Sequence, residues 1–400
     1  MKILSVQTQS QKRAFLDFPR QLYADDPNWV GPLDIELLNL FNPRKNPHFA
    51  EGEAQWWIAQ DAQGRVVGRI AAFIYYPKAR RYVVPTGGIG FFESIEDYTV
   101  AESLFWTAQE WLAARGMQAC DALINFGEND RFWGVLIEGF NSSPSYGMPY
   151  NKPYYAEFLT RYGFEIYFRQ ESRELDLRQL PERIIRIAQR TAQREGITFA
   201  SPNLRHLRQY ALDFMRIYND AWQYHEHFVP LTEERVMRMV DNLKSVLVEE
   251  MILFAYVDNE PAGVLLALPD LYQIFRPWRG RPSWWQLIQF LWRKRNKYEW
   301  YRRRGILTRA RVMLMGVRPK YQRRGLESAL AYLPIPPALR LGITHAELSW
   351  VGDFNPAMLA ILEATQAQRT RVHATFRLYF SEEARQQAQL NQNQIILRPS

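Results

Sequence analysis

The amino-acid sequence predicts an α/β protein built from two mixed-sheet units in tandem, each with a central twisted sheet flanked by helices. Three observations support this fold class. The chain has 400 residues, which is more than one hydrophobic core usually accommodates. Apolar residues make up 47% of the chain, as expected of a folded protein with a sizeable core. The two halves also repeat one order of elements, a hairpin followed by a strand and a helix.

A β-hairpin is predicted near the start of each repeat. Residues 55–71 hold two apolar runs on either side of the polar turn 61–64. Residues 251–267 show the same arrangement around the polar turn 258–260. Because apolar runs joined by a short polar turn are typical of antiparallel strands, each half is expected to contain such a pair.

A further strand and a helix follow each hairpin. Residues 88–92 form the next apolar run in the first half, and residues 312–317 form it in the second. Residues 99–115 carry apolar side chains at helical spacing, and a second amphipathic pattern over residues 180–195 predicts a connecting helix. We therefore expect an N-terminal unit at residues 1–172, a helical connector at 173–196 and a C-terminal unit at 197–400.

Composition argues against several classes of protein. No run of about 18 apolar residues occurs, so a membrane-spanning helix is not expected. The first residues lack the apolar core of a signal peptide, which favours a cytoplasmic location. The single cysteine, Cys120, cannot form an internal disulfide. It lies in an apolar stretch, where it is expected to pack as a small hydrophobic residue.

The segment that follows the strand 312–317 has the chemistry of a phosphate-binding loop. It is short and basic, contains Gly325, and leads into an apparent helix. Main-chain N–H groups at a helix start are free to bind an anion, and the helix dipole favours negative charge there. Arg323 and Arg324 would add charge-assisted donors. The alternative is an ordinary surface turn followed by an amphipathic helix.

The order of residues in this loop resembles the pyrophosphate loop of the GNAT-type N-acetyltransferase superfamily. The family pattern is Gln/Arg-x-x-Gly-x-Gly/Ala after a bulged strand, and Gln322 and Gly325 match it. Glu327 departs from it, because the family usually has Gly or Ala there. The resemblance implies acetyl-coenzyme A as co-substrate, with a strand bulge near Gly316 and Val317. The spacing of His225 and His227 could suggest a metal, but no metal is expected because no third and fourth ligand is obvious. The resemblance assigns coenzyme binding to Met315, Gly316, Val317, Gln322, Arg323, Arg324, Gly325, Leu326, Glu327 and Asn355. Asn355 has an alternative role as a helix cap before Pro356.

The general base is less well defined by the sequence. Glu347 lies in an alternating strand pattern and would activate the amine through water if it faced the cleft. The alternative is a solvated glutamate on an edge strand. Imidazole generally titrates near neutrality, so His225 and His227, which fall in the expected substrate loop, are further candidate bases, although surface histidines are the commoner outcome. Leu362 stands where many relatives have the tyrosine that protonates the departing thiolate.

The first half lacks a pyrophosphate loop, since the acidic segment 94–98 takes its place. The resemblance therefore implies a structural or substrate-shaping role for the first unit. It implies an acyl-coenzyme A-dependent N-acyltransferase in the second, acting on a small-molecule or peptide amine. The alternative is a catalytically degenerate binding protein that keeps the fold and docks on an anionic membrane surface.

The net charge of +8 is concentrated in a basic, tryptophan-rich insert, residues 276–304. This insert holds ten Lys or Arg residues and one acid, Glu299. Its middle predicts a helix with Trp284, Trp285 and Trp292 on one broad face. Three interpretations stay open: a helix packed on the domain with solvated cations, contact with anionic lipid, or nucleic acid binding. Nucleic acid is the least favoured of the three, because no recognisable binding module is visible.

Overall fold

The structure of the protein is a computed structural model that describes residues 1–127, 131–223, 229–243, 247–295 and 307–396. The chain folds into two compact units. The first contains residues 1–170, 275–283 and 371–400, and the second contains residues 171–274 and 284–370. Segments from both ends of the chain belong to the first unit. The domain limits at residues 172 and 196 stay a prediction.

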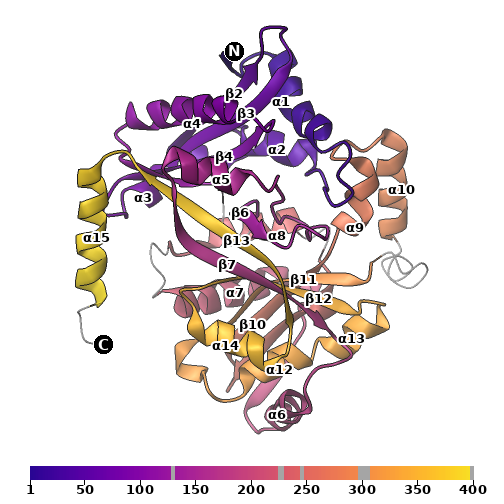
Figure 1. The fold of residues 1–400 in the computed structure, drawn as a ribbon. Helices are drawn as coiled ribbons and strands as arrows, with labels where there is room; N and C mark the ends of the chain where they lie inside the picture. The colour runs from indigo at the N-terminus through magenta and orange to yellow at the C-terminus, as the bar shows by residue number, and fades with distance from the viewer. Residues whose placement is uncertain (128–130, 224–228, 244–246, 296–306, 397–400) are drawn as a thin grey trace. The chain divides into compact units, whose positions relative to one another are not determined.

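The first unit has a mixed sheet in the order β1-β2-β3-β4-β5-β13, with β6 also paired to β13 (Figure 1). Its strands are β1 (Lys2–Ser5), β2 (Gly52–Gln60), β3 (Val66–Tyr75), β4 (Thr86–Ser94), β5 (Ala119–Ala122), β6 (Val135–Glu138) and β13 (Gln368–Tyr379). Its helices are α1 (Gln9–Leu22), α2 (Asp34–Leu40), α3 (Tyr76–Ala79), α4 (Tyr98–Ala113), α5 (Tyr155–Tyr162) and α15 (Glu382–Ile396), with short 3-10 turns at Pro47–Ala50 and Arg276–Trp278. Neighbouring strands of this sheet are antiparallel except β4 and β5, which are parallel.

Helices cover both faces of this sheet. Alternate residues of a strand point to opposite sides, so neighbouring residues of β2 belong to different cores. On β2, Trp57 packs in one core with α4 and α5. Its neighbour Ile58 packs in another core with Phe15 of α1 and Leu37 of α2. Cys120 is buried in the first of these cores, as predicted. Burial raises the pKa of its thiol, which disfavours the reactive thiolate.

The C-terminal strand β13 completes the sheet of the first unit. It is antiparallel to β5, with Phe376 opposite Ala122 and Leu378 opposite Cys120. Phe376 also lies in the core beneath α4. In Figure 1, β13 is the long yellow strand that follows α14 in the sequence.

The second unit has the strand order β7-β12-β11-β10-β9-β8. These strands are β7 (Glu165–Asp176, of which residues 171–176 belong here), β8 (Ile197–Ala200), β9 (Ile252–Val257), β10 (Glu260–Pro269), β11 (Arg309–Val317) and β12 (His345–Gly352). Its helices are α6 (Glu182–Ala192), α7 (Leu207–Trp222), α8 (Glu233–Leu243), α9 (Tyr272–Phe275), α10 (Trp284–Arg295), α12 (Leu326–Tyr332), α13 (Ile335–Arg340) and α14 (Pro356–Ala364). Short 3-10 turns lie at Leu204–His206, Glu249–Met251 and Pro319–Tyr321.

Helices also cover both faces of the second sheet. One core joins α6, α12 and α13 to β9, β10 and β11. A second core contains Ile217 of α7, Phe254 of β9 and Val264 of β10. Both predicted hairpins are confirmed as β2 with β3 and β9 with β10, and the predicted mixed sheets flanked by helices are present in each unit. No helix within the described segments has the length and apolar character needed to cross a bilayer.

Candidate active site of the second unit

The central parallel strands of the second unit separate partway along their length. Four residue pairs join β11 and β12, from Arg309 with His345 to Val312 with Leu348. Beyond these pairs, β11 continues to Val317 and β12 to Gly352 with no further pairing recorded between them. Met315, Gly316 and Val317, which were predicted to bind coenzyme, all lie on this diverging part of β11.

The bulge in β11 lies earlier than predicted. Leu266 of β10 pairs with Leu314, and Ala267 pairs with Val312, so Met313 is the extra residue. The pairing at Gly316 and Val317 is regular, so the prediction of a bulge at these residues is wrong. Its actual place coincides with the end of the pairing to β12. Since a bulge bends its strand, it accounts for the divergence of the two strands.

Gly316 is needed for packing. A Cβ built on Gly316 would lie 2.4 Å from ring carbons of Trp222, the last residue of α7. Trp222 in turn stacks on Tyr218, one turn earlier, with ring centroids 4.9 Å apart. The absence of a side chain at Gly316 therefore lets an aromatic pair close one face of the diverging strand.

The predicted phosphate loop connects β11 to α12 and has unusual backbone angles. Arg323 has φ 62° and Gly325 has φ 85°, both in the left-handed region. Within the described part of the chain, no hydrogen bond is recorded to the main-chain N–H groups of residues 323–328. These donors stand at the start of α12, where the helix dipole is positive.

Ion pairs and hydrogen bonds fix the base of this loop. Arg318 Nε contacts Asp220 Oδ2 at 2.6 Å, and its main-chain N–H donates to the carbonyl of Ala262. Lys320 Nζ and the Tyr321 hydroxyl both donate to Glu260 Oε2, at 2.5 and 2.7 Å. These two donors lower the pKa of the Glu260 carboxyl.

Within the loop, Gln322 serves a structural purpose, because its Nε2 donates to the carbonyl of Val317 at 3.1 Å and ties the loop to the strand end. Arg323 and Arg324 are exposed. The Arg324 guanidinium lies 5.5 Å from the centroid of the Tyr321 ring. The loop therefore presents two cations to solvent next to its free N–H groups.

Helix α6 packs against this loop, which the sequence did not predict. A Cβ on Gly325 would lie 2.4 Å from Thr191 Oγ1, and Thr191 is buried. Arg194, two residues beyond α6, donates from Nη1 to the carbonyl of Arg324 at 3.3 Å. The left-handed φ and the approach of α6 both require glycine at position 325. Arg194 adds a third cation to the loop, and its only sequence signal was the basic face of the connecting helix.

The remaining predicted coenzyme residues have clear structural roles. Leu326 is buried at the first position of α12, and Glu327 follows it in the first helical turn. A carboxylate at this place is favoured by the helix dipole, which gives a reason for the departure from the family pattern. The Asn355 side chain accepts a hydrogen bond from the main-chain N–H of Met358 at 3.1 Å. Asn355 thus caps α14, as its alternative interpretation proposed, and its contact with coenzyme stays a prediction.

Glu347 is buried at the centre of the sheet. Its strand lies between β7 and β11, and Glu347 is 1% exposed, so the interpretation as a solvated edge residue is wrong. It is the register partner of Arg311, whose Nε donates to Ser349 Oγ at 2.6 Å.

A second arginine belongs to this polar cluster. Arg309 binds the buried Asp270 from Nη2 at 2.6 Å and from Nε at 2.8 Å. Burial lowers the pKa of Arg309, but the charges of Asp270, Glu347 and Glu174 outweigh that effect and raise it. The paired end of β11 and β12 therefore holds a buried row of opposite charges.

Other candidate acids and bases are placed as follows. His225 and His227 lie outside the described residues. Leu362 is 5% exposed on α14. No group of three or more potential metal-ligating His, Cys, Asp or Glu side chains occurs among the residues that the structure covers.

In the first unit, the corresponding opening between strands is closed. β4 and β5 pair from Thr86 to Gly88 only, but Ile124 donates its main-chain N–H to the carbonyl of Ile89 at 2.8 Å. A Cβ on Gly90 would lie 1.8 Å from the carbonyl oxygen of Ile124. The helix that follows, α4, is capped by Asp97, whose carboxylate accepts from the N–H of Thr99. An acidic cap at this helix start repels phosphate.

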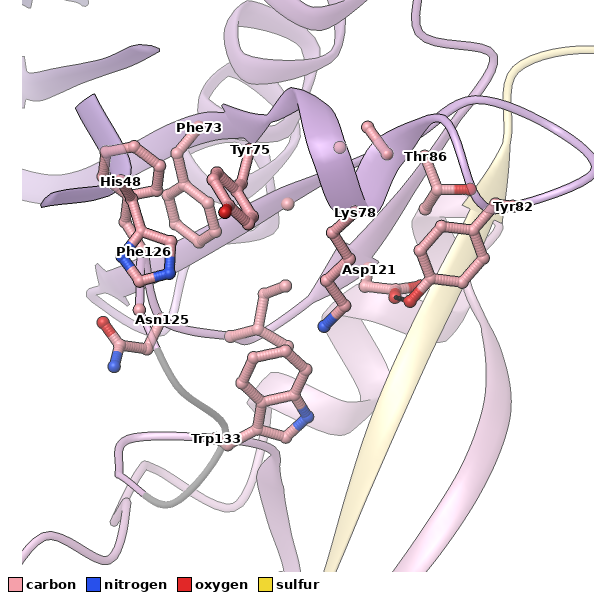
Figure 2. Close-up of a pocket in the computed structure, with 15 residues that line it drawn as sticks. His48, Phe73, Tyr75, Lys78, Tyr82, Thr86, Asp121, Asn125, Phe126 and Trp133 are labelled. Carbon is pink, nitrogen blue, oxygen red and sulfur yellow. Dashed lines mark hydrogen bonds between the residues drawn. The ribbon is translucent and has the colours of Figure 1, made fainter. Parts of the chain in front are cut away.

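A small cavity of about 50 Å³ lies beside this closed opening (Figure 2). Lys78 Nζ stands 4.5 Å from the centroid of the Trp133 ring on one side of it. Asp121 lines another side and accepts from the Tyr82 hydroxyl at 3.5 Å. The cavity has room for a few water molecules but not for a coenzyme.

Comparisons with other proteins agree with this architecture. No family model matches the chain. Protein YghO of Escherichia coli (strain K12) is 31% identical over 382 residues, which cover 92% of this chain and 92% of that protein. A protein of Caulobacter vibrioides (strain NA1000 / CB15N) named bacterial ceramide synthase is 29% identical over 396 residues, which cover 95% of this chain and 97% of that protein.

Solved structures show the same fold at low sequence identity. A tandem GNAT protein from the clavulanic acid biosynthesis pathway superposes with a TM-score of 0.57 at 12% identity, over 95% of this chain and 98% of that one. A GCN5-related N-acetyltransferase from Sphaerobacter thermophilus gives a TM-score of 0.51 at 14% identity, over 94% of this chain and 96% of that one. The chain belongs to the family of Protein YghO and has the tandem fold of the GNAT-type N-acetyltransferase superfamily.

Proposed function

We propose that the chain is an acyl-coenzyme A-dependent N-acyltransferase whose reaction takes place in the second unit. The observation that carries this proposal is the free edge of the loop between β11 and α12. Its main-chain N–H groups at residues 323–328 have no partner among the described residues, and three cations surround them. Such an edge suits the diphosphate of a coenzyme.

The reaction sets what the remaining groups must do. An amine attacks the thioester carbonyl carbon, the carbon–sulfur bond breaks, the nitrogen loses a proton and the thiolate gains one. The diverging strand beyond Met313 supplies main-chain donors that suit a coenzyme arm and a developing oxyanion. Glu347 is the proposed proton acceptor; it is the register partner of Arg311, and its charge raises the pKa of Arg309. Leu362 cannot donate a proton, so solvent protonates the thiolate.

We further propose a long-chain amino alcohol as the acceptor class. This rests on the relative named bacterial ceramide synthase, which is 29% identical over nearly the whole chain. A ceramide is the N-acyl derivative of such an amine. We also propose a cytoplasmic location, which the sequence favours.

Titration calorimetry with acetyl-coenzyme A tests the coenzyme site. We expect saturable binding by the wild type and at least a tenfold weaker affinity for Arg323→Glu/Arg324→Glu, because two charge-assisted contacts become repulsive. Arg205→Glu/Arg216→Glu is the matched control, since both arginines are exposed in the second unit outside the loop. The control should bind like the wild type. A wild type that does not bind, or two variants that bind equally, would contradict the proposal.

The alternative function is a binding protein that keeps the fold without catalysis. Leu362 at the place of the usual acid, and Glu327 in the first turn of α12, favour it. Release of free coenzyme thiol from an acyl-coenzyme A, followed with and without a long-chain amino alcohol, separates the two functions. Amine-dependent thiol release supports the enzyme, and coenzyme binding without any release supports the alternative.

A further inference from the structure

The helix of the basic insert exposes its apolar side chains. The sequence left open whether this face packs on the domain, and the structure shows that it does not. Six large apolar residues of α10 are between 43% and 74% exposed: Trp284, Trp285, Leu287, Ile288, Leu291 and Trp292. Contiguous apolar surface of this kind marks an interaction site.

These six residues lie on one side of α10. At about 100° per residue, their positions fall within an arc of roughly 160°. Gln286 and Phe290 lie on the opposite arc and are less exposed. A surface helix normally turns its apolar stripe inward, so α10 has the reverse arrangement. The Trp284 and Trp285 rings stack on each other with centroids 3.7 Å apart, which presents a broad aromatic surface.

The cations of the insert divide into two groups. The first group, Arg276, Arg279 and Arg281, is held within the first unit. Arg276 Nη2 donates to the carbonyl of Pro27, and Arg279 Nη2 donates to the carbonyl of Tyr23 at 3.4 Å. Arg281 forms ion pairs with Asp17 and Asp34 at 2.8 and 2.9 Å. The second group follows the apolar positions in the sequence at Arg293, Lys294, Arg295, Lys297 and 302–304. With Glu299 as the single acid, this second group has a net charge of 7 − 1 = +6.

We propose that α10 docks the protein on an anionic lipid bilayer, with its axis in the plane of the interface. Tryptophan and leucine side chains enter the boundary between head groups and acyl chains, while lysine and arginine interact with anionic head groups. The positive charge that follows the apolar stretch favours an anionic lipid surface as the partner. A second copy of this chain is disfavoured, because two copies would bring like charges together. This docking is independent of acyl transfer and would place the second unit next to lipid substrates.

Flotation of the full-length protein with vesicles tests the proposal without coenzyme or acceptor. We expect flotation with vesicles of phosphatidylcholine and phosphatidylglycerol, much less with phosphatidylcholine alone, and a decrease as salt rises. Leu291→Ser/Trp292→Ser should lower the bound fraction at least tenfold. Ile35→Ser/Trp106→Ser is the matched control. Ile35 and Trp106 belong to the first unit and are 60% and 57% exposed, so their substitution removes a similar area of apolar surface. All variants should keep the melting temperature of the wild type.

Three outcomes would overturn the proposal. One is a wild type that does not float, and another is equal loss of flotation in both double variants. The third is a lipid-free dimer, seen by sedimentation velocity, that Leu291→Ser/Trp292→Ser abolishes, since α10 would then be an interface between copies. None of these results bears on acetyl-coenzyme A binding, so the docking and the proposed function can fail separately.

Discussion

The guanidinium of Arg377 on β13 binds the carboxylate of Asp121 on β5 through two hydrogen bonds, of 2.7 Å from Nε and 3.0 Å from Nη2. Both side chains are nearly inaccessible, at 6% and 5% exposure. The same guanidinium lies 3.5 Å from the centroid of the Tyr167 ring. Burial lowers the pKa of Arg377, but the Asp121 charge outweighs it, so the arginine stays charged. This pair holds the last strand of the chain in the first sheet.

Removing one partner of this pair should be costly. We expect Arg377→Met or Asp121→Asn to lower the free energy of unfolding by about 3–5 kcal/mol, because each leaves a buried group without its partner. The double variant should lose clearly less than the sum, with a coupling energy of about 1–3 kcal/mol. Urea unfolding of the four proteins measures this, and additive losses would show that the pair is not coupled.

Glu93 should make stability depend on pH. The carboxyl is buried and accepts hydrogen bonds from the Tyr23 and Tyr155 hydroxyls, each at 2.7 Å. Burial raises the pKa of Glu93 above its ordinary value of 4.5, although the Arg69 charge and the two hydroxyls oppose that rise. The folded state therefore keeps this proton to higher pH than the unfolded state does.

The stabilisation from the Glu93 proton is fully present below the unfolded pKa and is lost as pH rises through the folded pKa. Within that window, stability should fall by up to about 1.4 kcal/mol per pH unit from this group. The urea midpoint of the wild type, compared with Glu93→Gln at a series of pH values, measures the slope. The exposed Glu110→Gln is the control, and an equal slope in wild type and Glu93→Gln would contradict the assignment.

Gly325→Ala should destabilise the second unit for two separable reasons. The left-handed backbone costs an L-residue about 1–2 kcal/mol, and the new methyl group meets Thr191 Oγ1. Thr191→Ala in the Gly325→Ala background should remove the second penalty and leave the first. Thermal unfolding of the two single variants and the double variant tests this, and a double variant less stable than Gly325→Ala would argue against the contact.

Glu347→Gln tests the proposed base. We expect kcat to fall by about 10²–10⁴ with little change in acetyl-coenzyme A affinity, since the side chain lies away from the loop. The pH–rate profile should also lose its acidic limb, which a purely structural role would leave in place. Unchanged kcat in a correctly folded variant would exclude Glu347 as the proton acceptor.

Local patterns in the sequence predicted the elements well. The helix expected at residues 99–115 is α4, Tyr98–Ala113, and the connecting helix expected at 180–195 is α6, Glu182–Ala192. Both hairpins have the predicted turns, because residues close in sequence pair with each other there. Periodicity and turn chemistry are local properties, so a sequence displays them directly.

Relationships between distant segments could not be predicted. The burial of Glu347 depends on β7 and β11 lying on both sides of β12, and a strand pattern does not name its neighbours. The contact of Thr191 with Gly325 likewise joins residues far apart in sequence. For α10, the amphipathic pattern was clear, but a pattern alone does not say whether the apolar side meets protein or solvent.

The pairing of β13 with β5 in the first sheet has a consequence for the synthesis of the protein on the ribosome. A ribosome releases the chain from its N-terminus, so β7 to β12 have all emerged before residues 371–379 follow. Until β13 has been synthesised, β5 therefore lies at an unpaired edge of the first sheet, where its free main-chain groups could pair with another chain.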